Sequence, residues 1–239
     1  MSGADLQALL AVQDLDLAAD QLRHRRDHLA ERAELTGIEA ESASARAERT
    51  ELGATLGSLY DRQAGAEADL AAAEERATTI NRRLFGGEVT ASRDLQAMSA
   101  ELEQLKARTS ALEDAVLEIM EEREPLEARA GQIDARLEQL AAARSGAETR
   151  LADAEQTIGA ELDDVRSRRT AAASSVPEGL MATYEKLRTR LGGVGVARLV
   201  GNHCDGCHLT LPAAELDRVR HLPEGEVYQC EQCSRILVP

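Results

Sequence analysis

The sequence is short of the residues that fill large globular cores. Its 239 residues include no Trp, one Phe, three Tyr and only five Pro. Ala, Leu, Glu and Arg dominate the first 175 positions instead. This composition argues against a compact enzyme with a large aromatic core and is typical of long helices or coiled coils.

Long hydrophobic runs are also missing. No apolar run approaches the roughly 18 residues that a membrane-spanning helix needs, so we expect no membrane partner. The first twenty residues have no basic segment and carry Asp within their apolar stretch, which argues against a signal peptide. We therefore expect a cytoplasmic protein, and in that compartment paired cysteines bind metal more often than they form disulfides.

Motifs of catalysis are absent as well. The sequence has no phosphate-binding loop and no nucleophile motif. We therefore do not expect an enzyme.

Acidic residues outnumber basic ones, giving a net charge of −15, but the balance changes along the chain. Residues 1–165 carry 18 basic and 35 acidic side chains, residues 166–194 carry six and two, and the last 45 residues carry four and six. A long acidic body repels nucleic acid, whereas the short basic segment could attract it. An alternative interpretation of this segment is a solvated helix face.

The basic side chains around this segment are the residues that would contact RNA or DNA phosphates. Only Tyr184 and Tyr228 lie near them in the sequence as possible stacking platforms for single strands. The phosphate-contact candidates are Arg166, Arg168, Arg169, Lys186, Arg188, Arg190 and Arg198.

Apolar residues recur with alternating spacings of three and four in two long runs, which is the pattern of a left-handed coiled coil. The second run keeps this spacing over nine heptads, with Arg123 and Arg144 at two seam positions from which an arginine can extend to water. Upstream, residues 36–50 blur the register. The first run consists of Leu52, Leu56, Leu59, Gln63, Ala66, Leu70, Ala73, Ala77, Ile80 and Leu84. The second begins Leu95, Met98, Leu102, Leu105, Thr109, Leu112, Val116 and Ile119 and continues to Ile158.

Residues 85–94, "FGGEVTASRD", separate the two runs. Gly86 and Gly87 permit a tight reversal there. If the chain folds back here, seam positions whose residue numbers sum to about 178 or 179 face each other. Small side chains then face large ones across the seam, as close packing requires. The four successive pairs are Ala77 with Leu102, Ala73 with Leu105, Leu70 with Thr109 and Ala66 with Leu112. An antiparallel hairpin within one chain is therefore predicted, with a parallel homodimer as the alternative.

The single Phe of the chain, Phe85, stands at the end of the predicted hairpin. An exposed aromatic residue at that place is a candidate docking residue for a protein partner. Alternatively, Phe85 only caps the seam.

The chain has four cysteines, in two C-x-x-C pairs within the last forty residues. Each C-x-x-C turn can direct two sulfurs at one ion, and Zn²⁺ binds four thiolates tetrahedrally. We predict one structural zinc ion held by Cys204, Cys207, Cys230 and Cys233, because four thiolates leave no open position for catalysis. An iron–sulfur cluster and a redox dithiol are the alternatives.

Short elements surround the two cysteine pairs. A linker helix with an apolar stripe at Leu180, Tyr184, Leu187 and Leu191 is expected to end at Gly192 and Gly193. Strands are expected over residues 194–204, 226–230 and 235–239, and a helix over 211–222. Gly206 relieves crowding inside the first cysteine turn, and His203 and His208 are expected to lie beside the metal without binding it. With so few large apolar side chains, the segment around the cysteines would scarcely fold without the metal.

Three stretches resemble one family, the bacterial C4-type zinc-ribbon proteins with a long N-terminal coiled-coil hairpin. They are the opening "LLAVQDLDLAADQL", the tip "NRRLFGGEVTASRDLQAMSAELEQL" and the ribbon "CDGCHLTLPAAELDRVR…VYQCEQCSRIL". The resemblance covers essentially the full length. It implies a non-enzymatic adaptor with the four cysteines as zinc ligands. Members are described as nucleic-acid-binding regulators or as chaperone-like partners of sigma-54 and of flagellar or secretion components.

The predicted fold is therefore mainly α: a long antiparallel coiled-coil hairpin followed by a small C-terminal zinc ribbon of the four-cysteine type. We expect the hairpin over residues 1–175 with its tip at about 85–92, the linker helix over 176–194 and the ribbon over 195–239. The expected function is that of a zinc-containing adaptor or regulatory protein that binds a protein partner through its coiled-coil hairpin, its zinc ribbon or both, and the resemblance implies a transcription- or secretion-related partner. RNA or DNA binding is the alternative, and monomer and dimer both remain open.

Overall fold

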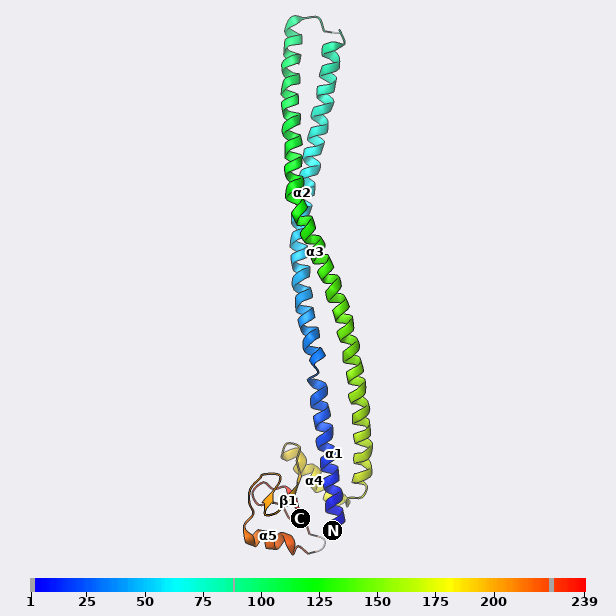
Figure 1. Cartoon of the computed structure of the whole chain (residues 1–239), viewed down its shortest axis with the longest axis vertical. Helices are drawn as coiled ribbons and strands as arrows, with labels where there is room; N and C mark the ends of the chain where they lie inside the picture. The colour runs from blue at the N-terminus through cyan, green and yellow to red at the C-terminus, as the bar shows by residue number, and fades with distance from the viewer. Residues whose placement is uncertain (1–2, 88, 224–225) are drawn as a thin grey trace. The chain divides into compact units, whose positions relative to one another are not determined.

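The computed structural model describes residues 3–87, 89–223 and 226–239, and helices form most of it (Figure 1). The chain divides into two compact units, Met1–Glu34 with Ala147–Pro239, and Leu35–Gly146. None of the helices in the described ranges is long and apolar enough to cross a membrane. The elements are α1 (Gly3–Asp27), α2 (Ala30–Phe85), α3 (Ser92–Ala173), α4 (Glu178–Arg190), β1 (Val196–Val200), β2 (His203–Cys204), α5 (Ala213–Arg220) and β3 (Ile236–Val238).

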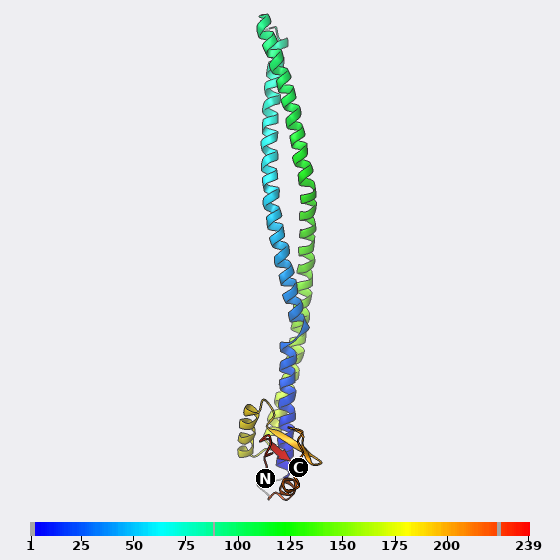
Figure 2. The same ribbon diagram turned by 90° about the vertical axis from the view of Figure 1, so that its left-hand side faces the viewer.

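The unit Leu35–Gly146 is an antiparallel hairpin and forms the central part of the stretch 1–175 over which the hairpin is predicted. In it α2 and α3 run side by side in opposite directions, and Figure 2 shows the same pairing from a second direction. Every predicted seam position from Leu52 to Leu84, and from Leu95 to Leu140, is buried or half-buried. The seam is thus filled within one chain, as the size pattern predicted.

Ion pairs that flank the seam fix its register. Arg76 pairs with Glu101, and Arg108 lies 3.9 Å from Asp69. Each pair lies one residue outside a predicted seam pair, so the reversal occurs where the sequence placed it. Glu88, within the predicted tip, lies outside the described residues.

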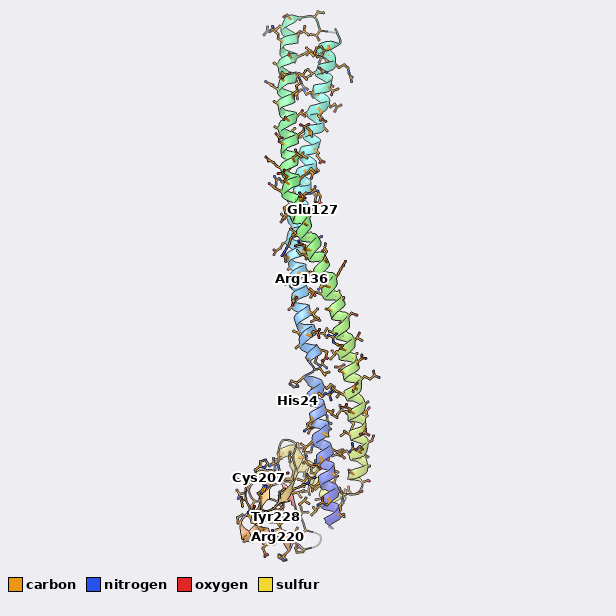
Figure 3. The ribbon with its side chains drawn as sticks, viewed as in Figure 1. His24, Glu127, Arg136, Cys207, Arg220 and Tyr228 are labelled. Atoms are coloured by element: carbon orange, nitrogen blue, oxygen red, sulfur yellow. The ribbon has the colours of Figure 1, made fainter. Side chains whose placement is uncertain are left out.

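The two seam arginines have different surroundings. Arg123 remains half-buried, with its guanidinium carbon 4.1 Å from the centre of the Tyr60 ring. It also donates to Glu127, which accepts a hydrogen bond from the Tyr60 hydroxyl at 2.6 Å. Figure 3 labels Glu127 on its helix. Arg144 is exposed instead, 3.7 Å from Glu39, as expected for a residue that extends out to water.

In the other unit, α1 packs against the last part of α3. Ala19, Ile158, Leu162 and Val165 form the buried centre of this contact. The chain leaves helical geometry at His28–Leu29, between α1 and α2. The sequence did not predict this break and placed its irregularity further along, at residues 36–50.

The C-terminal sheet has the strand order β2-β1-β3, with β1 antiparallel to β2 and parallel to β3. The strand predicted near 235–239 and the helix predicted within 211–222 are confirmed. The single strand predicted over 194–204 is instead two antiparallel strands, β1 and β2, which are separated by a turn at Gly201 with φ 65°. The strand predicted over 226–230 is wrong. Only an isolated bridge between Gln229 and Ile236 forms there, with the N–H of Leu237 donating to the carbonyl of Tyr228, and the chain then turns into the second cysteine pair.

One face of this sheet packs on helices rather than standing alone. Val196, Ile236 and Val238 join a single buried cluster with α1 residues such as Leu9 and with Tyr184 of α4. Gly192 and Gly193, at φ 71° and 105°, end α4 and redirect the chain into β1, as predicted. The ribbon is therefore stabilised by helix α1 as well as by its own turns.

A buried carboxylate ties three helices of this unit together. Asp16 of α1 is 6% exposed and accepts a hydrogen bond from Arg169 of α3 at 2.8 Å. The hydroxyl of Tyr184 in α4, itself fully buried, donates to the same carboxylate at 2.8 Å. Arg188 of α4 lies 3.7 Å away and donates to Asp20 at 2.7 Å. Two cations and a hydroxyl thus compensate the desolvation of this carboxylate.

The adjacent polar residue of α1 holds the strand that enters the ribbon. The side chain of Gln13 donates to the carbonyl of Gly193 at 3.0 Å and accepts from the N–H of Gly195 at 2.7 Å. Gln13 is 2% exposed and Gly195 is buried, so without the amide oxygen of Gln13 the N–H of Gly195 would lack this partner in a buried position.

Replacing Asp16 with Ala is expected to lower the free energy of unfolding by about 2–3 kcal/mol, because it leaves the buried Tyr184 hydroxyl without its acceptor and leaves Arg169 with Glu185 alone. The matched control is Asp14→Ala, which removes an exposed ion pair with Arg198 and should cost under about 1 kcal/mol. Urea denaturation followed by circular dichroism measures both. Equal losses for the two variants would contradict the role given to Asp16.

Candidate metal centre

The two C-x-x-C segments adopt the same backbone conformation. In the first, the N–H of His208 bonds the carbonyl of Cys204 at 2.7 Å, and in the second the N–H of Ser234 bonds that of Cys230 at 2.7 Å. His208 and Ser234 have positive φ values of 59° and 61°. The return bonds also match, since Cys204 and Cys230 each donate to the carbonyl five residues on, at 3.0 and 2.9 Å.

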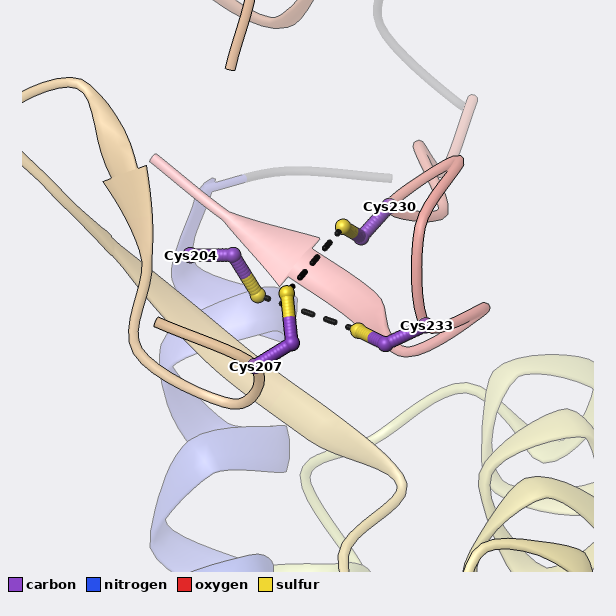
Figure 4. Close-up of side chains that lie close together, drawn as sticks. All are labelled: Cys204, Cys207, Cys230 and Cys233. Atoms are coloured by element: carbon purple, nitrogen blue, oxygen red, sulfur yellow. Dashed lines mark hydrogen bonds between the residues drawn. The ribbon is translucent and has the colours of Figure 1, made fainter. Parts of the chain in front are cut away.

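These two turns direct four sulfurs at one point (Figure 4). The ligand atoms of Cys204, Cys207, Cys230 and Cys233 all lie within 4.8 Å of one another. Two cross-turn distances, Cys204 to Cys233 and Cys207 to Cys230, are both 3.9 Å. This is too long for a disulfide, whose sulfurs are about 2.0 Å apart. A tetrahedron of thiolates at about 2.3 Å from zinc has edges of about 3.8 Å, so the donor set fits that ion.

An arginine and a glycine join the two turns. Arg235, just after the second pair, donates to the carbonyl of Gly206 in the first turn at 3.0 Å and to that of Val194 at 3.1 Å. A Cβ on Gly206 would lie 2.6 Å from the Arg235 side chain and 2.9 Å from the Cβ of Ala197. The prediction that Gly206 relieves crowding is confirmed, with Arg235 as the neighbour that crowds it.

Burial and backbone dipoles act in opposite directions on the thiols. Burial raises the pKa of Cys204 to about 12, although the N–H groups of Cys207 and Gly206 oppose it. Burial also raises the pKa of Cys230. For Cys233, burial is outweighed by hydrogen bonds from Arg235, which leave its pKa lowered. A metal ion binding here must displace protons, so affinity falls as the pH falls.

The histidines beside the first pair are not part of the sulfur cluster. Among the described residues, the group of possible metal ligands at this place consists of the four cysteines alone. His208 is exposed and His203 is half-buried.

Figure 3 labels Cys207 among the ribbon side chains, near Tyr228, whose hydroxyl donates to buried Glu215 at 3.3 Å.

Most of the candidate phosphate-binding residues are engaged with carboxylates. Arg169 and Arg188 lie against Asp16, and Arg198 donates to Asp14 at 2.9 Å. Two more form exposed pairs on α3, Arg166 with Asp163 and Arg168 with Asp164. The remaining two, Lys186 and Arg190, are exposed on α4 and form no ion pair with any residue the structure describes. The segment is basic in sequence but largely neutralised in space.

Phe85 is the last residue of α2 and is 78% exposed. The seam position next to it is Leu84, which is half-buried. Phe85 therefore does not fill the seam. Phe85 belongs to the unit Leu35–Gly146, whereas the four cysteines belong to the other unit.

Sequence reasoning missed Gln13, Asp16 and Arg235 as the residues that position the ribbon. The sequence did contain one indication of the roles of Gln13 and Asp16. Gln13 and Asp16 share a helical face with Leu9 and Val12, so two polar side chains stand on an apolar face. Their partners lie more than 150 residues further along the chain, and no local pattern identifies them.

The fold and the cysteine geometry define a coiled-coil hairpin joined to a four-cysteine zinc ribbon. Family comparison finds the same two parts: a CT398-like coiled coil hairpin domain over residues 12–192 and a C4-type zinc ribbon domain over residues 203–237. The chain belongs to the CT398-like coiled-coil hairpin family. The resemblance noted from sequence is thus confirmed.

Relatives and solved structures agree with this assignment. The chain is 30% identical to Uncharacterized protein Rv2229c of Mycobacterium tuberculosis over 235 residues, covering 98% of this chain and 95% of that protein. A solved Mycobacterium smegmatis protein matches with a TM-score of 0.87 at 24% identity, covering 100% and 99% of the two chains. CT398 from Chlamydia trachomatis matches with a TM-score of 0.69 at 22% identity, covering 98% and 96%. At these identities the two structures support the fold alone.

The substitution Gly206→Ala is expected to weaken zinc binding by roughly tenfold or more, since a Cβ there displaces Arg235 or Ala197 at a cost of about 1–3 kcal/mol. Gly179→Ala is the control, because nothing lies within 4 Å of a Cβ at that helical position. Competition against a chromogenic zinc chelator measures both. Similar affinities in the two variants would show that the contact between the turns is not needed for the site.

Proposed function

We propose that the chain is a non-enzymatic, zinc-containing adaptor that binds a protein partner through its coiled-coil hairpin. One structural Zn²⁺ per chain, held by Cys204, Cys207, Cys230 and Cys233, would close the ribbon. When bound, the ion cross-links the two cysteine turns and neutralises part of the thiolate charge. It is not assigned a catalytic role, because four thiolates fill its coordination sphere.

The observation that carries this proposal is the contrast between the two candidate binding surfaces. Most of the basic side chains near the ribbon form ion pairs with Asp14, Asp16, Asp20 and neighbouring carboxylates, which weakens the attraction of this segment for phosphates. The hairpin instead exposes large apolar side chains, Phe85 at 78% and Leu117 at 57%. Phe is among the residues enriched in the buried core of protein–protein interfaces, so Phe85 is the side chain best suited to such a contact.

The cytoplasm is the compartment that fits this proposal. The four cysteines are free thiols, in pairs separated by more than a disulfide length. A reducing compartment keeps such thiols available for metal.

Photocrosslinking from defined positions tests partner binding directly. A photoreactive phenylalanine analogue at Phe85 or at Leu117, in the full zinc-loaded chain expressed in its own cell, should form a discrete covalent adduct with a protein. The same analogue at Leu209, which is 51% exposed on the ribbon, reports whether the ribbon contacts that partner. Adducts from Leu209 alone would reject the hairpin as the binding surface, and adducts from none of the three would reject the adaptor proposal.

Nucleic-acid binding remains a second candidate because Lys186 and Arg190 are exposed and have no carboxylate partner in the described part of the chain. The adaptor proposal predicts no measurable RNA or DNA binding at physiological salt, where phosphate contacts are weak. Fluorescence anisotropy with labelled RNA and DNA over a salt series measures this. Binding at physiological salt that disappears when Lys186 and Arg190 are replaced with Gln would place nucleic-acid regulation first.

A further inference from the structure

The hairpin tip differs in charge from the rest of its unit. Residues 81–94 carry three arginines against two acidic residues, whereas the remainder of Leu35–Gly146 carries ten basic and twenty acidic side chains. The tip is therefore a weakly positive end on a strongly negative hairpin. A negatively charged partner is repelled along the flanks and attracted only at this end.

The tip arginines also differ in their contacts. Along the flanks, most arginines pair with carboxylates, as Arg49 does with Asp134 at 2.9 Å and Arg136 with Glu41 at 3.0 Å. Figure 3 labels Arg136. Arg82, Arg83 and Arg93 are all exposed, and none of them forms an ion pair within the described part of the hairpin. Among the described residues, no ion pair neutralises these three charges.

The turn holds an aromatic ring beside these charges. Phe85 is 78% exposed, while neighbouring Leu84 occupies the seam. Gly86 allows the close reversal, because a Cβ there would lie 2.7 Å from the carbonyl oxygen of Arg82. Gly87, at φ 79°, adopts a conformation that favours glycine. The backbone thus ends α2 in a way that leaves the ring in solvent.

We infer that the hairpin tip is a docking site for an acidic protein segment that carries an apolar side chain, with Phe85 making the apolar contact and Arg82, Arg83 and Arg93 the ionic ones. This inference rests on the proposed function and names the chemistry of its partner. A short acidic segment that meets the tip end-on avoids the acidic flanks. A long nucleic-acid strand does not avoid them, and a single aromatic side chain gives a lipid surface little to hold.

The substitution Phe85→Trp provides a reporter, because the chain has no other Trp. The full zinc-loaded protein with this substitution is titrated with a synthetic peptide of repeated Glu-Asp-Leu units. The indole emission should shift to the blue and saturate, since the ring leaves water. A peptide of repeated Lys-Arg-Leu units should cause no shift.

Charge dependence separates this site from nonspecific association. In the Phe85→Trp background, Arg83→Ala should weaken peptide binding by about tenfold, as expected for a lost contact to a charged partner, and the triple Ala variant of Arg82, Arg83 and Arg93 should abolish it. The matched control is Arg46→Ala. Arg46 is also exposed on α2 and forms no ion pair with a described residue, but it lies far from the tip in sequence. This control should leave affinity unchanged.

Three results would overturn the inference. They are the absence of a saturable shift with the acidic peptide, equal binding by the Arg83 and Arg46 variants, and stronger binding to vesicles of anionic phospholipid or to single-stranded RNA than to the peptide. The photocrosslinking experiment distinguishes failure of the tip site from failure of the proposed function. Protein adducts from Leu117 but not from Phe85, together with no peptide binding, would reject the tip site and leave the adaptor function standing.

Discussion

The buried carboxylate of Asp16 is the constraint on which the unit around the ribbon depends. It accepts from Arg169 and from Tyr184, and so joins α1 to α3 and to α4. One turn earlier, Gln13 bonds the backbone on both sides of Val194, where α4 gives way to β1. Helix α1 therefore positions the ribbon through polar groups that would be costly to bury without these partners.

Two kinds of stabilisation meet in the C-terminal residues. On one side of the sheet, Ala197, Leu237, Leu211 and Val219 pack around buried Cys204 and Cys230. On the other side, Val196, Ile236 and Val238 pack on α1 and α4. The first cluster is small, and a zinc ion held by the four cysteines would hold its two turns together. The second belongs to the helices, so the ribbon and α1 form one packed structure.

The sequence predicted the parts of the fold that depend on local periodicity or on a recognisable set of metal ligands. The heptad seam, the reversal after Leu84 and the convergence of four cysteines all follow from spacing. The parts that it did not predict depend on partners distant in the chain. Asp16 meets residues more than 150 positions away, and the basic segment was interpreted without the carboxylates that neutralise it. The helix break at His28–Leu29 was not predicted either, because no Pro or Gly stands there to indicate it.

Hydrogen exchange of α1, with and without zinc, tests the central claim that helix and ribbon form one structure. The account predicts that removing zinc with a chelator speeds amide exchange in the ribbon and also in α1 from Leu6 to Gln13, the stretch that packs on the sheet, while the seam of Leu35–Gly146 keeps its protection. Faster exchange confined to the ribbon, with α1 unchanged, would contradict it. The two would then be independent parts, and the polar contacts of Gln13 would not couple them.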